Sequence, residues 1–341
     1  MSKGNRTAYA VFLVLIALFP LLFGKSSYTT SVALFAGINA LVALGLSVLM
    51  GYAGQISLGQ AGFYGIGAYV SALLSARYGV PVLLSLPAAM AVAAAAAVVL
   101  AIPALRLKGH YLAVATLGFG EIIHVVLNEW GPGGPSGFGD IPPLGILGYT
   151  LTSASAWFYF VWGIVAIVML FSFNLIHSRN GRALRAIHDS ETASNAMGVD
   201  VSALKVKVFV LSAVYAALAG GLYAHYVTFI SPGSFSLFYS VLVLMMVVVG
   251  GINNLWGAVG GSLFITVLPE ALRQFQEFDI LAYGLILTLS LLFFRKGFVP
   301  LLIEKIRFRA LRKSPRTAPS PPLGAEGAEA MGKGGRPDAR D

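Results

Sequence analysis

Long apolar segments without charged residues recur along this chain, and they constrain its fold more than any other feature. Each approaches the roughly 20 residues that an α-helix needs to cross the hydrocarbon core of a membrane. A transmembrane β-barrel would instead have segments of about ten residues with alternating hydrophobicity. We therefore expect an all-α polytopic membrane protein with about ten spans, at 8–24, 31–50, 58–76, 82–103, 111–128, 154–176, 206–227, 237–252, 257–272 and 280–294.

The composition agrees with a membrane protein. Only 11% of the residues are charged and 57% are hydrophobic, whereas a soluble domain carries about a quarter charged residues. The chain has no cysteine, which excludes disulfide bonds, thiolate metal sites and thiol catalysis. The net charge of +9 does not indicate a nucleic-acid partner, because the basic residues gather at the ends of the spans, where they set orientation.

The distribution of charge predicts which side each loop faces. With a cytoplasmic N-terminus, basic residues concentrate in the expected cytoplasmic segments, at Lys3, Arg6, Arg106, Lys108, Arg179, Arg182, Arg185, Lys205, Lys207, Arg295, Lys305, Arg307, Arg309, Arg312, Lys313 and Arg316. The expected exterior loops hold only three, Lys25, Arg77 and Arg273. This asymmetry requires an even number of spans, so both termini are expected to be cytoplasmic.

The two ends of the chain differ in character. No Ala-x-Ala cleavage pattern follows the first span before Tyr28, so we expect that span to be retained rather than removed as a signal peptide. Residues 1–313 are expected to form the transmembrane domain. Residues 314–341 are rich in proline, glycine, alanine and charge, which predicts a disordered cytoplasmic tail.

A polar segment at 178–207 interrupts the apolar spans and has a regular pattern. Leu184 and Ile187 recur with helical spacing, and Gly198 follows where a helix end commonly needs a left-handed residue. Asp200 or Ser202 can cap the next helix. The pattern predicts a helix, a glycine turn and a second helix. Taken alone, it fits a solvated connector, a helix lying on lipid or a surface that binds a soluble partner.

The segment 51–69 contains six glycines, together with Gln55, Ser57 and Gln60. Small residues let transmembrane helices approach closely, and clustered glycine also permits a broken helix whose backbone faces a cavity. Both interpretations remain open for this segment and for the glycine-rich span at 257–272. The spans at 58–76 and 257–272 are thus the two that could be re-entrant or broken.

Two further groups of polar residues lie in or beside the spans. Glu121 and His124 share one face of the fifth span and can pair, and an ionisable residue in a span is also a candidate for function. Asn253 and Asn254 stand at the end of an apolar segment. They can cap a helix or line a route through the membrane.

Four motifs, in order along the chain, resemble the branched-chain amino acid permeases of ABC importers. They are Met50–Gly59 followed by Gly67-Ala68-Tyr69, residues 106–123, Gly181–Ile187 followed by Ala196-Met197-Gly198, and residues 247–264. A weaker match lies at 131–142. The segment 247–264 also resembles the first glycine-rich motif, as an internal repeat would. Family members often have Arg at the position of His188 and Ala at that of Ser194. The set is most similar to the longer, LivM-type subunit.

The resemblance implies a non-catalytic permease subunit in the inner membrane of a prokaryote. Its implied partners are a second homologous permease, two ABC ATPase subunits, a periplasmic or extracellular solute-binding protein and membrane lipid. No cofactor or metal is expected in this chain, because ATP and Mg²⁺ would be bound by the ATPases. The implied ATPase-coupling residues are Gly181, Arg182, Leu184, Arg185, Ile187, Asp189, Glu191, Ala193, Ala196, Met197 and Gly198. Residues of a pathway or gate would come from Gly51, Gly54, Gln55, Ser57, Gly59, Gln60, Glu121, His124, Asn253 and Asn254.

Other functions are also considered. Related permeases carry urea, amides or aromatic acids, and an ion-coupled secondary transporter would place acidic residues in its spans, where only Glu121 qualifies. Gly134-Pro135-Ser136-Gly137 looks like the motif of rhomboid-type proteases, but no histidine span is placed to serve Ser136 as a base. Residues 327–333 fit the start of a phosphate-binding loop, but Gly334 replaces the Ser or Thr that it requires.

Overall fold

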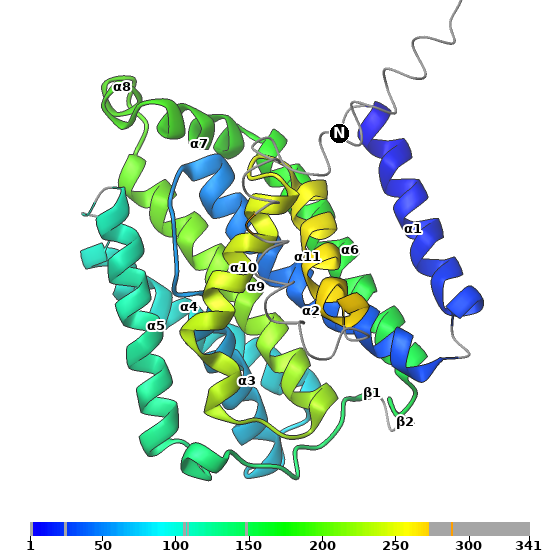
Figure 1. The fold of residues 1–341 in the computed structure, drawn as a ribbon. Coiled ribbons are helices and arrows are strands. Elements are labelled where there is room, and N and C mark those ends of the chain that lie inside the picture. The colour runs from blue at the N-terminus through cyan, green and yellow to red at the C-terminus, as the bar shows by residue number, and fades with distance from the viewer. Residues whose placement is uncertain are drawn as a thin grey trace, which may run out of the picture. The chain divides into compact units, whose positions relative to one another are not determined.

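Eleven α-helices stand mostly side by side in the part of the chain that the computed structural model describes (Figure 1). That part is residues 3–23, 26–104, 107, 109–146, 149–272 and 288, all within the first of two units, Met1–Leu301. The span predicted at 280–294 and the tail at 314–341 therefore lie outside the described residues, apart from Thr288.

The elements are α1 (Lys3–Phe23), α2 (Ser27–Ser47), the π-helical turn η1 (Val48–Tyr52), α3 (Gln60–Ala76), α4 (Val82–Ala104), α5 (His110–Trp130), the 3₁₀ turn η2 (Gly134–Ser136), β1 (Gly145–Ile146), β2 (Tyr149–Thr150), α6 (Ala154–His177), α7 (Arg179–Asp189), α8 (Glu191–Ala196), α9 (Val201–Val227), the 3₁₀ turn η3 (Pro232–Phe235), α10 (Leu237–Gly250) and α11 (Leu255–Leu272). Each predicted span from 8–24 to 257–272 coincides with one of these helices. The antiparallel pair β1–β2 was not predicted.

The helices are unequal in their ability to cross a membrane. Within the described residues, five are long and apolar enough: α2 continued by η1, α4, α5, α6 and α9. Shorter apolar helices cover Thr7–Pro20, Leu237–Gly250 and Leu255–Glu270. The protein is thus a polytopic membrane protein. The span predicted at 58–76 is the 17-residue helix α3, which is preceded by non-helical chain, whereas the span at 257–272 is a continuous helix, α11.

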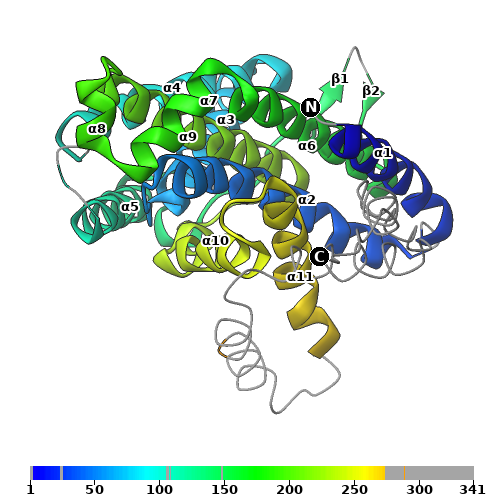
Figure 2. The same ribbon diagram turned by 90° about the horizontal axis from the view of Figure 1, so that it is seen from above.

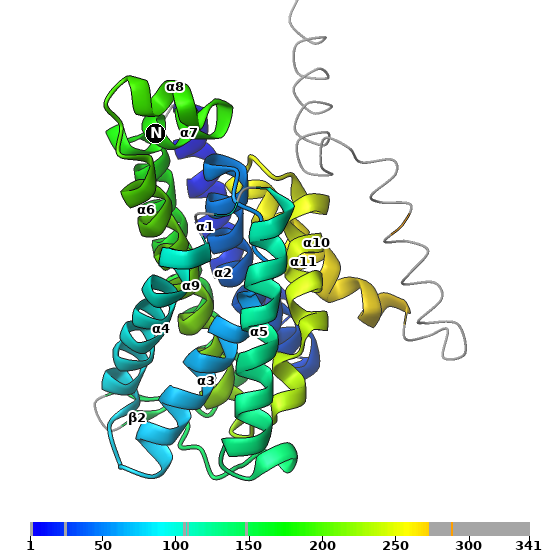
Figure 3. The same cartoon turned by 90° about the vertical axis from the view of Figure 1, so that its left-hand side faces the viewer.

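Helix α2 forms the centre of the bundle. It contacts α6, α9, α10 and α11, and Figure 2 shows it between α9 on one side and α10 and α11 on the other. In its apolar stretch 83% of the residues are buried, against 22% in α5. A spanning helix that is apolar all round and buried all round belongs to the interior of a bundle. Helix α5 instead stands at the flank (Figure 3).

Helices α3 and α9 approach each other closely enough for their backbones to touch. A β-carbon at Gly220 would lie 1.9 Å from the carbonyl oxygen of Tyr64, and one at Gly67 would lie 2.1 Å from that of Ala217. Only glycine fits at such positions, which is how small residues serve helix packing in membranes. The interpretation of the glycine-rich segment as a packing surface therefore holds for α3.

A hydrogen-bonded chain ties four segments together at the end of the bundle that carries β1 and β2. The fully buried His225 of α9 has Nδ1 2.8 Å from the carbonyl oxygen of Pro142. Its Nε2 lies 2.9 Å from Oγ of Ser71 in α3, which is 2.8 Å from Oγ of Ser85 in α4. Since a carbonyl can only accept, Nδ1 donates, and in a neutral imidazole Nε2 then accepts from Ser71. All three side chains therefore have partners.

The close contact between α3 and α9 predicts the effect of adding one methyl group. Gly220→Ala should lower the yield of folded protein and its thermal unfolding midpoint, because an overpacked core costs about 1–3 kcal/mol. Gly163→Ala in α6 is the matched control, since a β-carbon there meets nothing within 4 Å and alanine favours helix. Size-exclusion profiles and melting curves in detergent measure both. Equal behaviour of the two variants would contradict the packing described above.

Candidate functional site

Helices α7 and α8 lie across one end of the upright helices, opposite the end that carries β1 and β2 (Figure 1). The Ser178 side chain caps α7 by accepting a hydrogen bond from the Gly181 amide, and its own hydroxyl donates to the carbonyl oxygen of Leu175 in α6. A β-carbon at Gly181 would lie 2.1 Å from the carbonyl oxygen of Ile176. The tight turn between α6 and α7 therefore depends on Gly181, the first of the predicted coupling residues.

The two faces of α7 differ sharply. Gly181, Leu184 and Ile187 are buried against the bundle, whereas Arg182 and Arg185 are exposed. Since residues three and four apart share a helix face, the apolar stripe fixes which side of α7 rests on the protein. The amphipathic helix expected from the sequence is present, and its charged face is directed outward.

The shape of the segment differs from the prediction in one respect. Instead of a single helix as far as Gly198, the chain breaks at Ser190, whose hydroxyl accepts a hydrogen bond from the amide of Ala193 and starts α8. Gly198 then takes a left-handed conformation, with φ of 80°, and Asp200 caps α9 through the amide of Ala203, as predicted. The break leaves Ala193 and Ala196 exposed, with Met197 83% exposed.

An ion pair fastens α8 to the bundle. Lys205 of α9 donates a hydrogen bond to Glu191 Oε1, and the Lys205 side chain is almost entirely buried. A buried ammonium group is tolerated only with such a partner. Because the two residues lie fourteen positions apart on different helices, no local pattern in the sequence could have revealed the pair.

The predicted coupling segment and the predicted glycine-rich segment meet at Gly54. This residue has φ of 66°, and a β-carbon on it would lie 2.8 Å from Cδ2 of His188 in α7. Glycine is needed here for two reasons, the left-handed backbone and the room for the imidazole ring. In the sequence, His188 is only a departure from the family pattern, and this contact was not predicted.

The turn between α10 and α11 packs against η1 and the end of α2. Ser47 donates a hydrogen bond to the carbonyl oxygen of Ile252, and Tyr52 donates to that of Asn253. A β-carbon at Gly51 would lie 2.1 Å from the Ile252 carbonyl oxygen. Asn254 accepts a hydrogen bond from the Trp256 amide at the start of α11, the capping role considered for it. Gly51, Gly54 and Asn253 are thus brought together beside α7.

Beyond Ala53 the chain runs along the bundle without helical structure as far as Gly59 (Figure 1). Thr116 of α5 accepts a hydrogen bond from the Leu58 amide, and Ser240 of α10 accepts one from the Ala61 amide. The Gln60 side chain donates to Ser212 of α9. Helix α3 thus begins among the inner parts of three other helices, and the broken helix expected for this segment is present, with its interruption before Gln60.

Two glutamine side chains beside this break are buried with unused hydrogen-bonding atoms. Gln55 is 3% exposed and Gln60 1% exposed, and neither the Gln55 amide nor Oε1 of Gln60 has a partner in the part of the chain that the structure describes. Leaving such a group unpaired costs about 1–3 kcal/mol. Three of the buried side-chain atoms that lack a partner among the described residues therefore gather at the break, which lowers the local stability there.

The predicted pair of Glu121 and His124 does not form. Glu121 makes no ion pair with any described residue and is exposed on α5, while Nδ1 of His124 is buried without a partner. In the described residues, no cluster of three acidic or histidine side chains could hold a metal ion.

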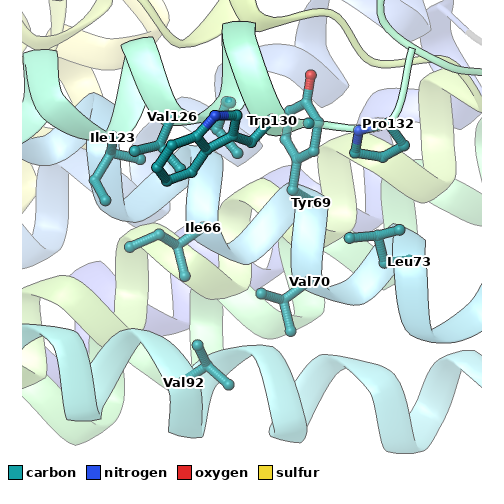
Figure 4. A pocket seen from close by; sticks show the side chains of 11 residues that line it. Ile66, Tyr69, Val70, Leu73, Val92, Ile123, Val126, Trp130 and Pro132 are labelled. Carbon is teal, nitrogen blue, oxygen red and sulfur yellow. The ribbon is translucent and has the colours of Figure 1, made fainter. Parts of the chain in front are cut away.

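An apolar crevice of about 270 Å³ lies on another side of α5, between that helix, α3 and α4. Figure 4 shows Ile123, Val126 and Trp130 of α5 facing Ile66, Tyr69, Val70 and Leu73 of α3 across it, with Val92 of α4 at its edge. Trp130 at the helix end is 84% exposed, as aromatic residues at the level of lipid headgroups are. This side of α5 suits hydrocarbon.

A family model described as the permease component of the branched-chain amino acid transport system matches residues 28–294. The chain is 32% identical to the high-affinity branched-chain amino acid transport system permease protein LivM of Escherichia coli strain K12, over 87% of this chain and 75% of that protein.

More distant relatives share parts of the sequence. A probable branched-chain amino acid transport permease protein LivM of Methanocaldococcus jannaschii is 26% identical over 58% of this chain and 62% of its own length. The L-arabinose transport system permease protein AraH of Escherichia coli strain K12 is 30% identical over 40% of this chain and 44% of its own. No solved structure matches the chain.

The contact at Gly54 predicts a defect that backbone strain alone does not explain. Gly54→Ala should lower the free energy of unfolding by more than the roughly 1–2 kcal/mol that a left-handed backbone costs alanine, because the methyl group also displaces His188. Gly79→Ala is the matched control, since Gly79 has φ of 63° and nothing lies within 4 Å of its β-carbon position. Chemical unfolding of both variants measures the difference. An equal loss would show that His188 does not rest on Gly54.

Proposed function

Because the chain belongs to the family of permease components of branched-chain amino acid transport systems, we propose that it forms half of the pore of an ATP-driven importer. The subunit itself is non-catalytic. Two ATPase subunits would bind ATP and Mg²⁺, and a second homologous permease and a solute-binding protein would complete the assembly. The proposed location is the inner membrane of a prokaryote, with α7 and α8 in the cytoplasm, where the basic residues at their end of the bundle would place them.

The observation that carries the coupling role is the two-sided character of α7. Its apolar residues Leu184 and Ile187 are buried in the bundle, so lipid contact is not needed to shelter them. Arg182 and Arg185 are exposed, together with the apolar tip at Met197. Exposed methionine and arginine, framed by a rigid scaffold, are typical of surfaces that bind another protein. This favours an ATPase surface over a lipid-bound helix or a solvated connector.

The attachment points of the segment support a route for movement into the membrane. Helix α7 is joined to α6 at Ser178, rests on the broken segment at Gly54, and passes into α8, which is held to α9 by Glu191 and Lys205. Closure of the ATPase pair would therefore displace two spanning helices and the interrupted chain together. Alternating access in transporters commonly relies on such discontinuous helices.

Leucine, isoleucine and valine are the proposed substrates, by analogy with the function that the names of the LivM relatives print. Uptake of radiolabelled leucine into vesicles that contain the complete assembly tests this. We expect transport to require ATP inside the vesicles and the solute-binding protein outside. Leucine uptake driven by an ion gradient without ATP would instead support a secondary transporter. Transport of only urea, amides or aromatic acids would change the substrate but not the class.

The exposed tip at Met197 gives a direct test of ATPase docking. Met197→Glu should reduce co-purification of the ATPase subunits about tenfold, because a carboxylate would have to be buried in an apolar contact. Met197→Leu, which keeps the size and polarity, is the control. Insertion and thermal stability should be unchanged in both, since Met197 is 83% exposed. Full ATPase recovery with Met197→Glu would contradict the docking role.

The ion pair beneath α8 predicts a charge-swap rescue. Glu191→Lys or Lys205→Glu alone should destabilise the protein by about 1–3 kcal/mol, and should uncouple ATP hydrolysis from uptake because α8 is released from α9. The double variant restores opposite charges and should recover most of both properties. Thermal unfolding and the ratio of leucine imported to ATP hydrolysed are the measurements. Absence of any recovery would mean that the pair does not anchor α8.

A further inference from the structure

A carboxylate stands exposed in the middle of a membrane-spanning helix. Glu121 lies near the centre of α5, about 14 Å from the nearer end at 1.5 Å per residue, and its side chain is exposed and makes no ion pair with any described residue. A charged group at that depth costs several kcal/mol in hydrocarbon and normally faces water or a partner charge. Lipid is therefore not what this residue faces in the working protein.

The surroundings of Glu121 on α5 have the same open character. Val114, Gly118 and Val125 lie on the same face of α5 as Glu121, at three- and four-residue spacing. We call Glu121 and these three residues the Glu121 face. Val114 and Val125 are 65% and 49% exposed, and a β-carbon at Gly118 would meet nothing within 4 Å. No described part of the chain covers this surface.

The other exposed side of α5 is of the opposite kind. The crevice described above is lined on α5 by Ile123, Val126 and Trp130, none of which carries a charge (Figure 4), and a membrane supplies acyl chains to fill it. One helix thus presents an apolar side that suits lipid and a side that carries a carboxylate. The crevice side of α5 therefore suits lipid, and the Glu121 face suits water or a polar molecule.

We propose that the Glu121 face lines the aqueous route through the transporter, and that the Glu121 carboxylate contacts the ammonium group of the amino acid as it crosses. This inference rests on the proposed function, which makes a zwitterionic amino acid the substrate. The ammonium group offers the positive charge and the donors that an unpaired carboxylate needs. The apolar residues Val114 and Val125 on either side suit an aliphatic side chain.

The absence of cysteine from the chain allows an accessibility test with two neighbouring valines. Val125→Cys lies on the Glu121 face, and Val126→Cys lines the crevice. In the complete assembly in vesicles, labelling is read on this subunit's own gel band. Val125→Cys should react with water-soluble methanethiosulfonates, about fivefold faster with the cationic than with the anionic reagent because of the nearby carboxylate. Adding Glu121→Gln should abolish that preference. Val126→Cys should react only with a lipid-soluble maleimide.

The role of the charge is tested by transport. Glu121→Gln should slow ATP-driven leucine uptake about tenfold, while assembly with the ATPases remains normal. Glu129→Gln, at the end of the same helix, is the matched control and should transport at the wild-type rate. If Val125→Cys resists the water-soluble reagents, the face is covered by lipid or another subunit and the inference fails. Wild-type uptake by Glu121→Gln also overturns it. Failure of the proposed function itself would appear separately, as normal ATPase recovery with Met197→Glu.

Discussion

Hydrogen bonds from backbone amides to side-chain hydroxyl groups help this chain to leave the helical state inside a membrane. Backbone groups freed by a break in a transmembrane helix have no water to bind and must find partners within the protein. Two of those partners come from other helices, since Thr116 of α5 accepts from the Leu58 amide and Ser240 of α10 accepts from the Ala61 amide. The same bonds fix where α3 begins, and so they determine which residues of α3 can reach α9.

The consequences of the break extend in both directions along the chain. On one side, Gly54 in the interrupted segment provides the surface on which His188 of α7 rests. On the other, α3 meets α9 at Gly67 and Gly220, where the two backbones touch. The six residues of non-helical chain that begin at Gly54 thus lead from the contact with α7 to α3 and its close contact with α9. Among them, Gln55 is buried with hydrogen-bonding atoms that have no partner in the described residues.

Local chemistry made much of this arrangement predictable. Hydropathy located the helices from 8–24 to 257–272, because a spanning helix needs a long apolar stretch whatever it packs against. Gly198 and Asp200 were predicted correctly since a left-handed residue and a side-chain cap depend only on their own neighbourhood. The break at Ser190 was missed, although a serine before Glu191 is itself a capping signal. The family motifs then singled out residues 178–207 as the proposed coupling segment.

Contacts between distant residues could not be predicted in this way. Glu191 with Lys205 and Gly54 with His188 join residues on different elements, and one sequence has no pattern that pairs them. Hydropathy also overstated the length of the third span, because a window over apolar residues does not register where hydrogen bonding changes from helix to extended chain. Glu121 and His124 were expected to pair from their spacing, but the spacing permits a contact without requiring it.

The buried chain of Pro142, His225, Ser71 and Ser85 gives the two ends of the bundle different mechanical properties. It bonds α3, α4, α9 and the loop before β1 into one unit at the end that carries β1 and β2. At the opposite end, six residues of non-helical chain separate α3 from α2 and the η1 turn that continues it. The end of the subunit that carries β1 and β2 is therefore the more rigid one, and the end that carries α7 bends more easily. A force applied at α7 is expected to rotate helices about the rigid end.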